Sequence, residues 1–119
     1  PSKGSYSKQQ VIDLAESVGF SREDAYTVSQ IAKGESGRDP TNSTKRSGLM
    51  AESGEDSVGM MQINCAFHQY RGWLQKLCIN KREDLFDPVL NMKATFYLFN
   101  ENKGFRDWSV YTSGEYKDY

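Results

Sequence analysis

One glutamate, Glu35, stands out in the sequence because it falls on the apolar side of a predicted helix. Ala25, Val28 and Ala32 precede it at steps of three and four residues, a spacing that puts all four side chains on one helical face. An apolar helix face packs against the core, and a carboxyl group placed there loses water, which raises its pKa. From this pattern alone, a functional carboxyl group with a raised pKa and an ordinary helix-end glutamate facing solvent both stay open.

The helix that must position this carboxyl group is predicted from its start and stop signals. Ser21 with Asp24 has the spacing of a cap, and Gly34 and Gly37 weaken the helix around Glu35, near its end. A shorter helix precedes it, opened by a capping box of Ser7 and Gln10 and closed by Gly19. Because so few residues join the two helices, we expect them to pack as an angled pair.

A second stretch with chemical potential is Gly59–Asn64, which reads Gly-Met-Met-Gln-Ile-Asn. Gln62 is an amide among apolar neighbours and must find a hydrogen-bond partner, either within the protein or on a sugar. Gly59 allows the backbone to approach a neighbouring segment or a ligand closely. The preceding Thr41–Ser57 segment is polar and rich in serine and glycine, and predicts a loop with a small hairpin.

The rest of the chain supplies core helices. Phe67 to Leu77 has the spacing of a third helix, and Asp87 with Pro88 opens a fourth that is apolar nearly all round. Such a helix is expected to be central and buried until Asn102 and Gly104 end it. An aromatic tail from Trp108 to Tyr119 follows, with one or two helical turns.

Composition narrows the classes of function. The 119 residues suit a single domain over residues 1–119, and the net charge of −1 disfavours nucleic-acid binding. No apolar run is long enough to insert into a membrane. Cys65, Cys78 and His68 lack metal-ligand spacing, so no metal or cofactor is expected, while a disulfide and two free thiols both stay open. A first residue of Pro1 suggests a domain excised or processed from a longer chain.

Four blocks in order carry a family resemblance: Glu35–Ser36, Gly59–Asn64, Asp84–Asn91 and Trp108–Gly114. They resemble soluble lytic transglycosylases and the wider lysozyme-like superfamily, and the last block resembles the version found in phage tail and virion lysins. This resemblance implies a mainly α, lysozyme-like α+β fold. It would have about five to six helices, a small hairpin or loop lobe and an active-site cleft between them.

By this resemblance Glu35 is the catalytic acid, and Ser36 hydrogen-bonds near the site and fixes the helix end. Met61 and Gln62 would line the sugar cleft, and Tyr111 would orient the Glu35 carboxyl group. For Gln62 the alternative is an amide satisfied within the protein, and for Tyr111 it is one more aromatic ring in a packed tail.

One departure from the family pattern bears on mechanism. Animal-type lysozymes place a catalytic aspartate where this sequence has Ser57, which we assign to substrate binding. Asp56 is a candidate second carboxylate, although it and Glu55 are out of register with that aspartate. With one assured acid, a lytic transglycosylase is favoured over a muramidase that uses two carboxylates.

The resemblance also implies a partner and a location. The expected partner is the glycan strand of bacterial peptidoglycan, met by a monomeric domain in a phage tail or otherwise outside the cell, alongside other tail proteins. A non-catalytic wall-binding or structural tail module is the alternative of another class, and the presence of Glu35, Gln62 and Tyr111 together argues against it.

Overall fold

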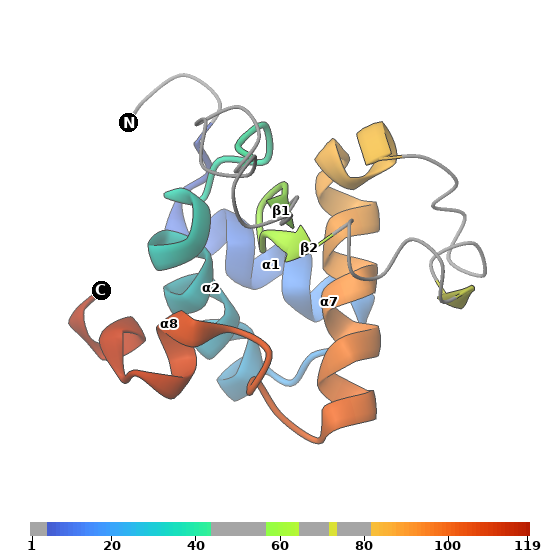
Figure 1. Cartoon of the computed structure of the whole chain (residues 1–119). Coiled ribbons are helices and arrows are strands. Elements are labelled where there is room, and N and C mark those ends of the chain that lie inside the picture. Colours follow the sequence, from blue (N-terminus) through green and yellow to red (C-terminus); the bar gives the residue numbers. More distant parts are fainter. Residues whose placement is uncertain (1–4, 44–56, 65–71, 74–81) are drawn as a thin grey trace.

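The computed structural model describes residues 5–43, 57–64, 72–73 and 82–119 (Figure 1). Within these ranges the chain is mainly helical with one small hairpin, which confirms the expected fold class. In chain order the elements are α1 (Lys8–Val18), α2 (Arg22–Ser36), β1 (Ser57–Val58), β2 (Ile63–Asn64), the 3-10 helix η1 (Arg82–Phe86), α7 (Pro88–Asn102), α8 (Ser109–Thr112) and the 3-10 helix η2 (Glu115–Asp118).

The predicted caps of the first two helices and the predicted end of the first are confirmed. Ser7 and Gln10 form a reciprocal capping box, in which each side chain accepts a hydrogen bond from the other residue's backbone N–H. Gly19 caps the end of α1 at a φ of 129°. Ser21 caps α2, and Gly37 ends it in the left-handed conformation that glycine adopts without strain.

Helix α7 begins as predicted but is not buried all round. The Asp87 carboxylate accepts hydrogen bonds from the N–H groups of Val89 and Leu90, and Pro88 is the first helical residue. The Val89 side chain, however, is 43% exposed, so the prediction of an almost wholly buried helix was wrong. The buried side of α7 consists of Asn91, Met92, Ala94, Thr95 and Leu98.

The hairpin pairs Ser57 with Asn64 and Val58 with Ile63 in antiparallel register. Ser43 adds an isolated bridge to Val58. This hairpin follows the Thr41–Ser57 segment in which a hairpin was predicted, and most of that segment lies outside the described residues. The helix predicted over Phe67–Leu77 also lies outside them, apart from residues 72 and 73.

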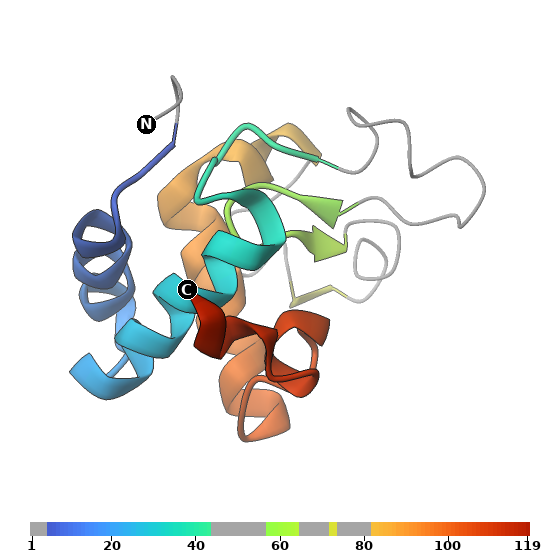
Figure 2. The ribbon, with the colours of Figure 1, turned by 90° about the vertical axis from the view of Figure 1, so that its left-hand side faces the viewer.

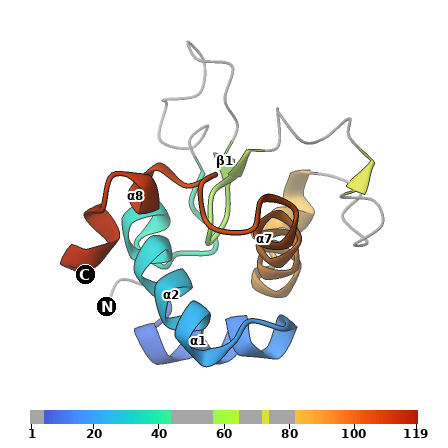
Figure 3. The same ribbon diagram turned by 90° about the horizontal axis from the view of Figure 1, so that it is seen from below.

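The helices enclose the hairpin on three sides. Seen from below, α1 lies across the base with α2 and α7 rising on either side, and the hairpin lies opposite α1 (Figure 3). The C-terminal segment, α8 and η2, packs along α2 (Figure 2). Fully buried side chains such as Val11, Ile31 and Met92 fill the space between these elements. No helix in the described ranges has the length and apolar character needed to cross a membrane.

Candidate active site

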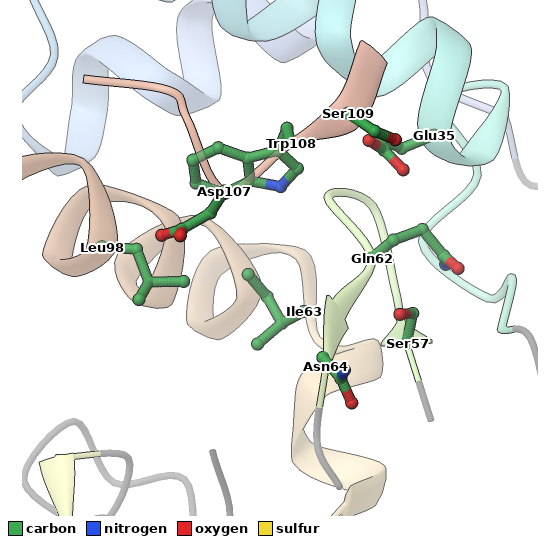
Figure 4. Close-up of a pocket in the computed structure, with 9 residues that line it drawn as sticks. All are labelled: Glu35, Ser57, Gln62, Ile63, Asn64, Leu98, Asp107, Trp108 and Ser109. Carbon is green, nitrogen blue, oxygen red and sulfur yellow. The ribbon is translucent and has the colours of Figure 1, made fainter. Parts of the chain in front are cut away.

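A cavity of about 250 Å³ opens where the end of α2, the hairpin, α7 and the start of α8 meet (Figure 4). Six of the nine lining residues are polar or charged, and three are apolar. The lining residues are Glu35, Ser57, Gln62, Ile63, Asn64, Leu98, Asp107, Trp108 and Ser109.

Glu35 enters this cavity from the last turn of α2. The preceding residues of its face, Ala25, Val28 and Ala32, are fully buried, as the helical phase predicted. Glu35 itself is partly exposed because the helix ends at the cavity wall. The carboxyl group therefore stands at the border between the core and an open cleft.

A glycine beside Glu35 lets a second wall come close. A Cβ atom on Gly34 would lie 2.6 Å from Cγ1 of Val110, a distance too short for ordinary packing. Glycine thus allows α8 to pack directly on α2. This approach brings Ser109 next to the Glu35 carboxyl group in the view of Figure 4.

The turn of the hairpin is held by side chains from three directions. Ser36 donates a hydrogen bond to the carbonyl of Met60 at 2.6 Å, and the Trp108 indole N–H donates to the carbonyl of Met61 at 2.8 Å. Asn91 of α7 supplies the third contact, described next. Because buried backbone polar groups require partners, these contacts fix the position of the turn relative to Glu35.

Asn91 is fully buried and uses its whole amide. Its Nδ2 donates to the carbonyls of Val58 and Leu85, each at 2.9 Å, and its Oδ1 accepts the N–H of Met61 at 3.0 Å. Gly59 makes room for this arrangement, since a Cβ there would overlap the Leu85 carbonyl and the Asn91 amide. The predicted close approach at Gly59 is therefore confirmed, and the partner is Asn91.

Gln62 adopts a left-handed backbone, with φ of 51°, which is uncommon for a residue other than glycine. Its Nε2 donates to the carbonyls of Gly59 at 2.9 Å and Asn42 at 3.2 Å. Both N–H groups are thereby used, and Oε1 has no hydrogen bond within the described residues. Gln62 lines the cavity, and its Oε1 atom keeps an unused acceptor position.

Some of the site residues predicted from the sequence line the cavity, and others do not. Ser57 and Gln62 line the cavity together with Glu35, whereas Ser36 lies behind it as a brace of the hairpin turn. The Met61 side chain is fully buried and does not line the cavity, so this residue contributes its backbone carbonyl to Trp108 instead.

Tyr111 is not in the cavity lining, and the second predicted carboxylate lies outside the described residues. The Tyr111 ring stacks on Tyr116, with centroids 4.8 Å apart, and is not among the residues that line the cavity. Asp56 and Glu55 lie outside the described residues, and the structure therefore gives them no position.

Asp107 and Ser109 are cavity residues that the sequence reading missed. Trp108, between them, is extended, with φ of −111° and ψ of 116°, and its ring is buried. Because Trp108 is extended and its indole is held by the Met61 carbonyl, Asp107 and Ser109 flank it, and all three residues line the cavity. The Trp108–Gly114 block was the available sequence signal for this wall, but the only site residue predicted from it was Tyr111.

Metal binding has no candidate site among the residues the structure describes. No group of three or more histidine, cysteine, aspartate or glutamate side chains there is arranged to hold a metal ion. The cavity instead offers carboxylates, hydroxyls and amides, which are suited to protons and to sugar hydroxyl groups.

Comparison with known proteins agrees with this arrangement. Residues 12–110 match the family model described as a lysozyme like domain, which covers most of the chain and every residue that lines the cavity. Neither the curated proteins nor the solved structures gave a match. A match of this extent means that the chain belongs to the lysozyme-like domain family, a family of glycosidases and transglycosylases that act on peptidoglycan.

Proposed function

We propose that the protein is a peptidoglycan lytic transglycosylase in which Glu35 is the catalytic acid and base. The main support is that Glu35 on α2 shares one cavity with two residues of the hairpin, Ser57 and Gln62. Lysozymes with two catalytic carboxylates need an acid on one side and a nucleophile or base on the other. A hydroxyl in that position suits a reaction that needs one carboxyl group.

The proposed reaction has two steps at one side chain. Protonated Glu35 donates its proton to the oxygen joining N-acetylmuramic acid to N-acetylglucosamine, and the bond from that oxygen to C1 breaks. The acetamido oxygen of the muramoyl unit stabilises the positive charge on C1. Ionised Glu35 then takes the proton of the 6-hydroxyl group, whose oxygen bonds to C1 and closes a 1,6-anhydro ring without water.

The neighbours of Glu35 have complementary tasks in this scheme. The Gln62 Oε1 atom, with both N–H groups of its amide engaged, can accept a hydrogen bond from the substrate. Ser57 and Ser109 present hydroxyl groups to the same cavity. Because the hairpin turn is fixed by buried hydrogen bonds, these groups are held ready before the glycan arrives.

The test combines a variant with product analysis. Glu35→Gln keeps the side-chain shape but cannot donate the proton, and should reduce cleavage of purified peptidoglycan by at least about 100-fold. Glu23→Gln, the same substitution at an exposed position in the first turn of α2, should leave cleavage unchanged. Mass spectrometry of the wild-type products should find anhydromuramoyl ends, and full activity of Glu35→Gln would exclude Glu35 as the acid.

A muramidase is the second candidate, because Asp107 places another carboxylate in the cavity. In the view of Figure 4, Trp108 lies between the carboxyl groups of Glu35 and Asp107. If Asp107 activates water, the products will carry reducing ends that are one water heavier than the anhydro form. Exclusively reducing products would replace the transglycosylase proposal with this one.

We also propose that the protein acts at the bacterial wall as part of a phage tail. The support is the resemblance of Trp108–Gly114 to the corresponding block of tail and virion lysins. Mass spectrometry of purified virions tests this location directly. Absence of the protein from virions, with wall-cleaving activity intact, would place it elsewhere.

A further inference from the structure

We infer that Asp107 is a substrate-binding residue, which accepts a hydrogen bond from a saccharide unit next to the bond that Glu35 cleaves. The inference rests on the proposed function for the identity of the ligand, a glycan strand. It adds to that function a binding group on the opposite side of Trp108 from the catalytic acid (Figure 4).

The backbone sets where this group stands. Trp108 is extended, and its indole is tied inward to the Met61 carbonyl at 2.8 Å. In an extended segment, residues two apart lie on the same side at about 6 to 7 Å. Asp107 and Ser109 therefore present two oxygen-bearing side chains along one edge of the cavity, with Ser109 at the end near Glu35 and Asp107 at the far end.

Neighbouring side chains hold Asp107 on one side. Asn102 Nδ2 donates to Asp107 Oδ2 at 2.5 Å, and Arg106 Nη2 donates to Asn102 Oδ1 at 2.9 Å. The guanidinium group thus fixes the amide, and the amide fixes the carboxylate. Among the described residues Asp107 Oδ1 has no hydrogen bond, so one oxygen is positioned and still available.

The surroundings of Asp107 fit a sugar unit. Leu98, Ile63 and Trp108 form the apolar part of the lining on this side of the cavity (Figure 4). A saccharide has an apolar C–H face and a rim of hydroxyl and amide N–H donors. The three apolar residues are almost fully buried, so the main contact is a hydrogen bond from a rim donor to the exposed carboxylate, which accepts hydrogen bonds only.

The test separates binding from chemistry. For Asp107→Ala we expect KM on soluble peptidoglycan strands to rise about tenfold, the lower range for a hydrogen bond to a charged group. The kcat should stay within about twofold of wild type, because the group binds ground state and transition state alike. Asp107→Asn preserves the side-chain shape and should show the same direction of change if Asp107→Ala folds poorly.

Asp13→Ala is the matched control. Asp13 is also exposed and also accepts a hydrogen bond from a neutral amide, Gln9 Nε2 at 2.9 Å, but it lies on α1 away from the cavity. Its KM should equal that of wild type. An unchanged KM in both Asp107 variants overturns the inference, and so does a fall in kcat with KM unchanged, which would make Asp107 a catalytic carboxylate.

A binding measurement distinguishes failure of this inference from failure of the proposed function. Calorimetric titration with soluble peptidoglycan strands is made on Glu35→Gln with and without Asp107→Ala. Weaker binding in the double variant supports the role of Asp107 even if the wild-type protein proves to be a hydrolase or inactive. Equal binding overturns the role of Asp107 alone, and absence of binding in both overturns it together with the proposed substrate.

Discussion

The hairpin wall, residues 57–64, and the opposite wall, residues 107–109, face the same cavity but differ in burial and in how they are held. Six of the eight hairpin-wall residues are buried, and the turn backbone is bound by Ser36, Asn91 and Trp108. In the opposite wall only Trp108 is buried, while Asp107 and Ser109 are exposed on either side of it.

The hairpin wall therefore determines the shape of the site, whereas the opposite wall provides exposed groups that a ligand can contact. Buried backbone groups are costly to leave without partners, so the hairpin wall has one favoured position. The opposite wall is fixed at its centre by one indole and offers its other side chains to solvent. A ligand would therefore meet a wall of set shape on one side and exposed oxygen-bearing groups on the other.

The largest expected effect comes from removing the central brace of the hairpin wall. Asn91→Ala leaves the Met61 N–H and the carbonyls of Val58 and Leu85 without their partner in a buried site. We expect the free energy of unfolding to fall by about 3 to 5 kcal/mol, because several unsatisfied buried groups add up. Urea titration followed by circular dichroism measures this loss.

Asn100→Ala is the matched control, since Asn100 is exposed on the same helix. It should change the free energy of unfolding by less than about 0.5 kcal/mol. If the two variants are equally stable, the hairpin wall does not depend on Asn91, and the contrast between the walls disappears.

The sequence predicted those features of the fold that depend on residues close together in the chain better than those that depend on distant residues. The caps at Ser7, Ser21 and Asp87 were predicted because each involves residues only two or three positions apart. The burial of α7 was predicted less well. Its apolar residues indicated a helix buried all round, whereas its most consequential buried residue is the polar Asn91, whose partners lie in distant segments.

The site residues were likewise predicted only where nearby residues determine their place. Helical phase placed Glu35 at the edge of the core, and the block around Gln62 placed that amide in the cavity. Met61 could not be assigned from its motif, since only the packed structure decides that its side chain is buried and its carbonyl holds Trp108. Asp107 was missed because its place depends on which way the neighbouring tryptophan turns.

A smaller effect is expected from loosening the opposite wall at its anchor. Trp108→Phe keeps an aromatic ring but removes the N–H that bonds the Met61 carbonyl. The free energy of unfolding should fall by about 1 to 3 kcal/mol, and KM should rise because Asp107 and Ser109 lose their fixed direction. Chemical denaturation and steady-state kinetics on soluble peptidoglycan strands measure the two effects.

Trp73→Phe makes the same replacement at the other tryptophan, whose ring stacks on Tyr97 at 4.5 Å and does not line the cavity. It should alter stability without raising KM. An unchanged KM in Trp108→Phe would show that the opposite wall keeps its geometry without this hydrogen bond, and would make the two walls more alike than their contacts suggest.

The smallest expected effect concerns Tyr119, at the end of the C-terminal segment that follows the opposite wall, where its ring lies near Gly34 of α2. A hydrogen bond from its hydroxyl to Glu115, with partial desolvation and the charges of Glu115 and Asp118, raises the pKa of Tyr119 above its usual value of 10.0. The folded state therefore holds this proton more tightly than the unfolded state. The resulting stabilisation is complete below the unfolded pKa and is lost as pH rises through the folded pKa.

Tyr119→Phe removes this source of pH dependence. As pH rises above about 10, the usual pKa of tyrosine, the melting temperature of the variant should fall less steeply than that of wild type. Tyr26→Phe removes another exposed tyrosine hydroxyl and serves as the comparison. Because the bond to Glu115 is exposed, the difference should be small, and parallel curves for wild type and Tyr119→Phe would mean that the Tyr119–Glu115 contact adds nothing to the packing of the C-terminal segment on α2.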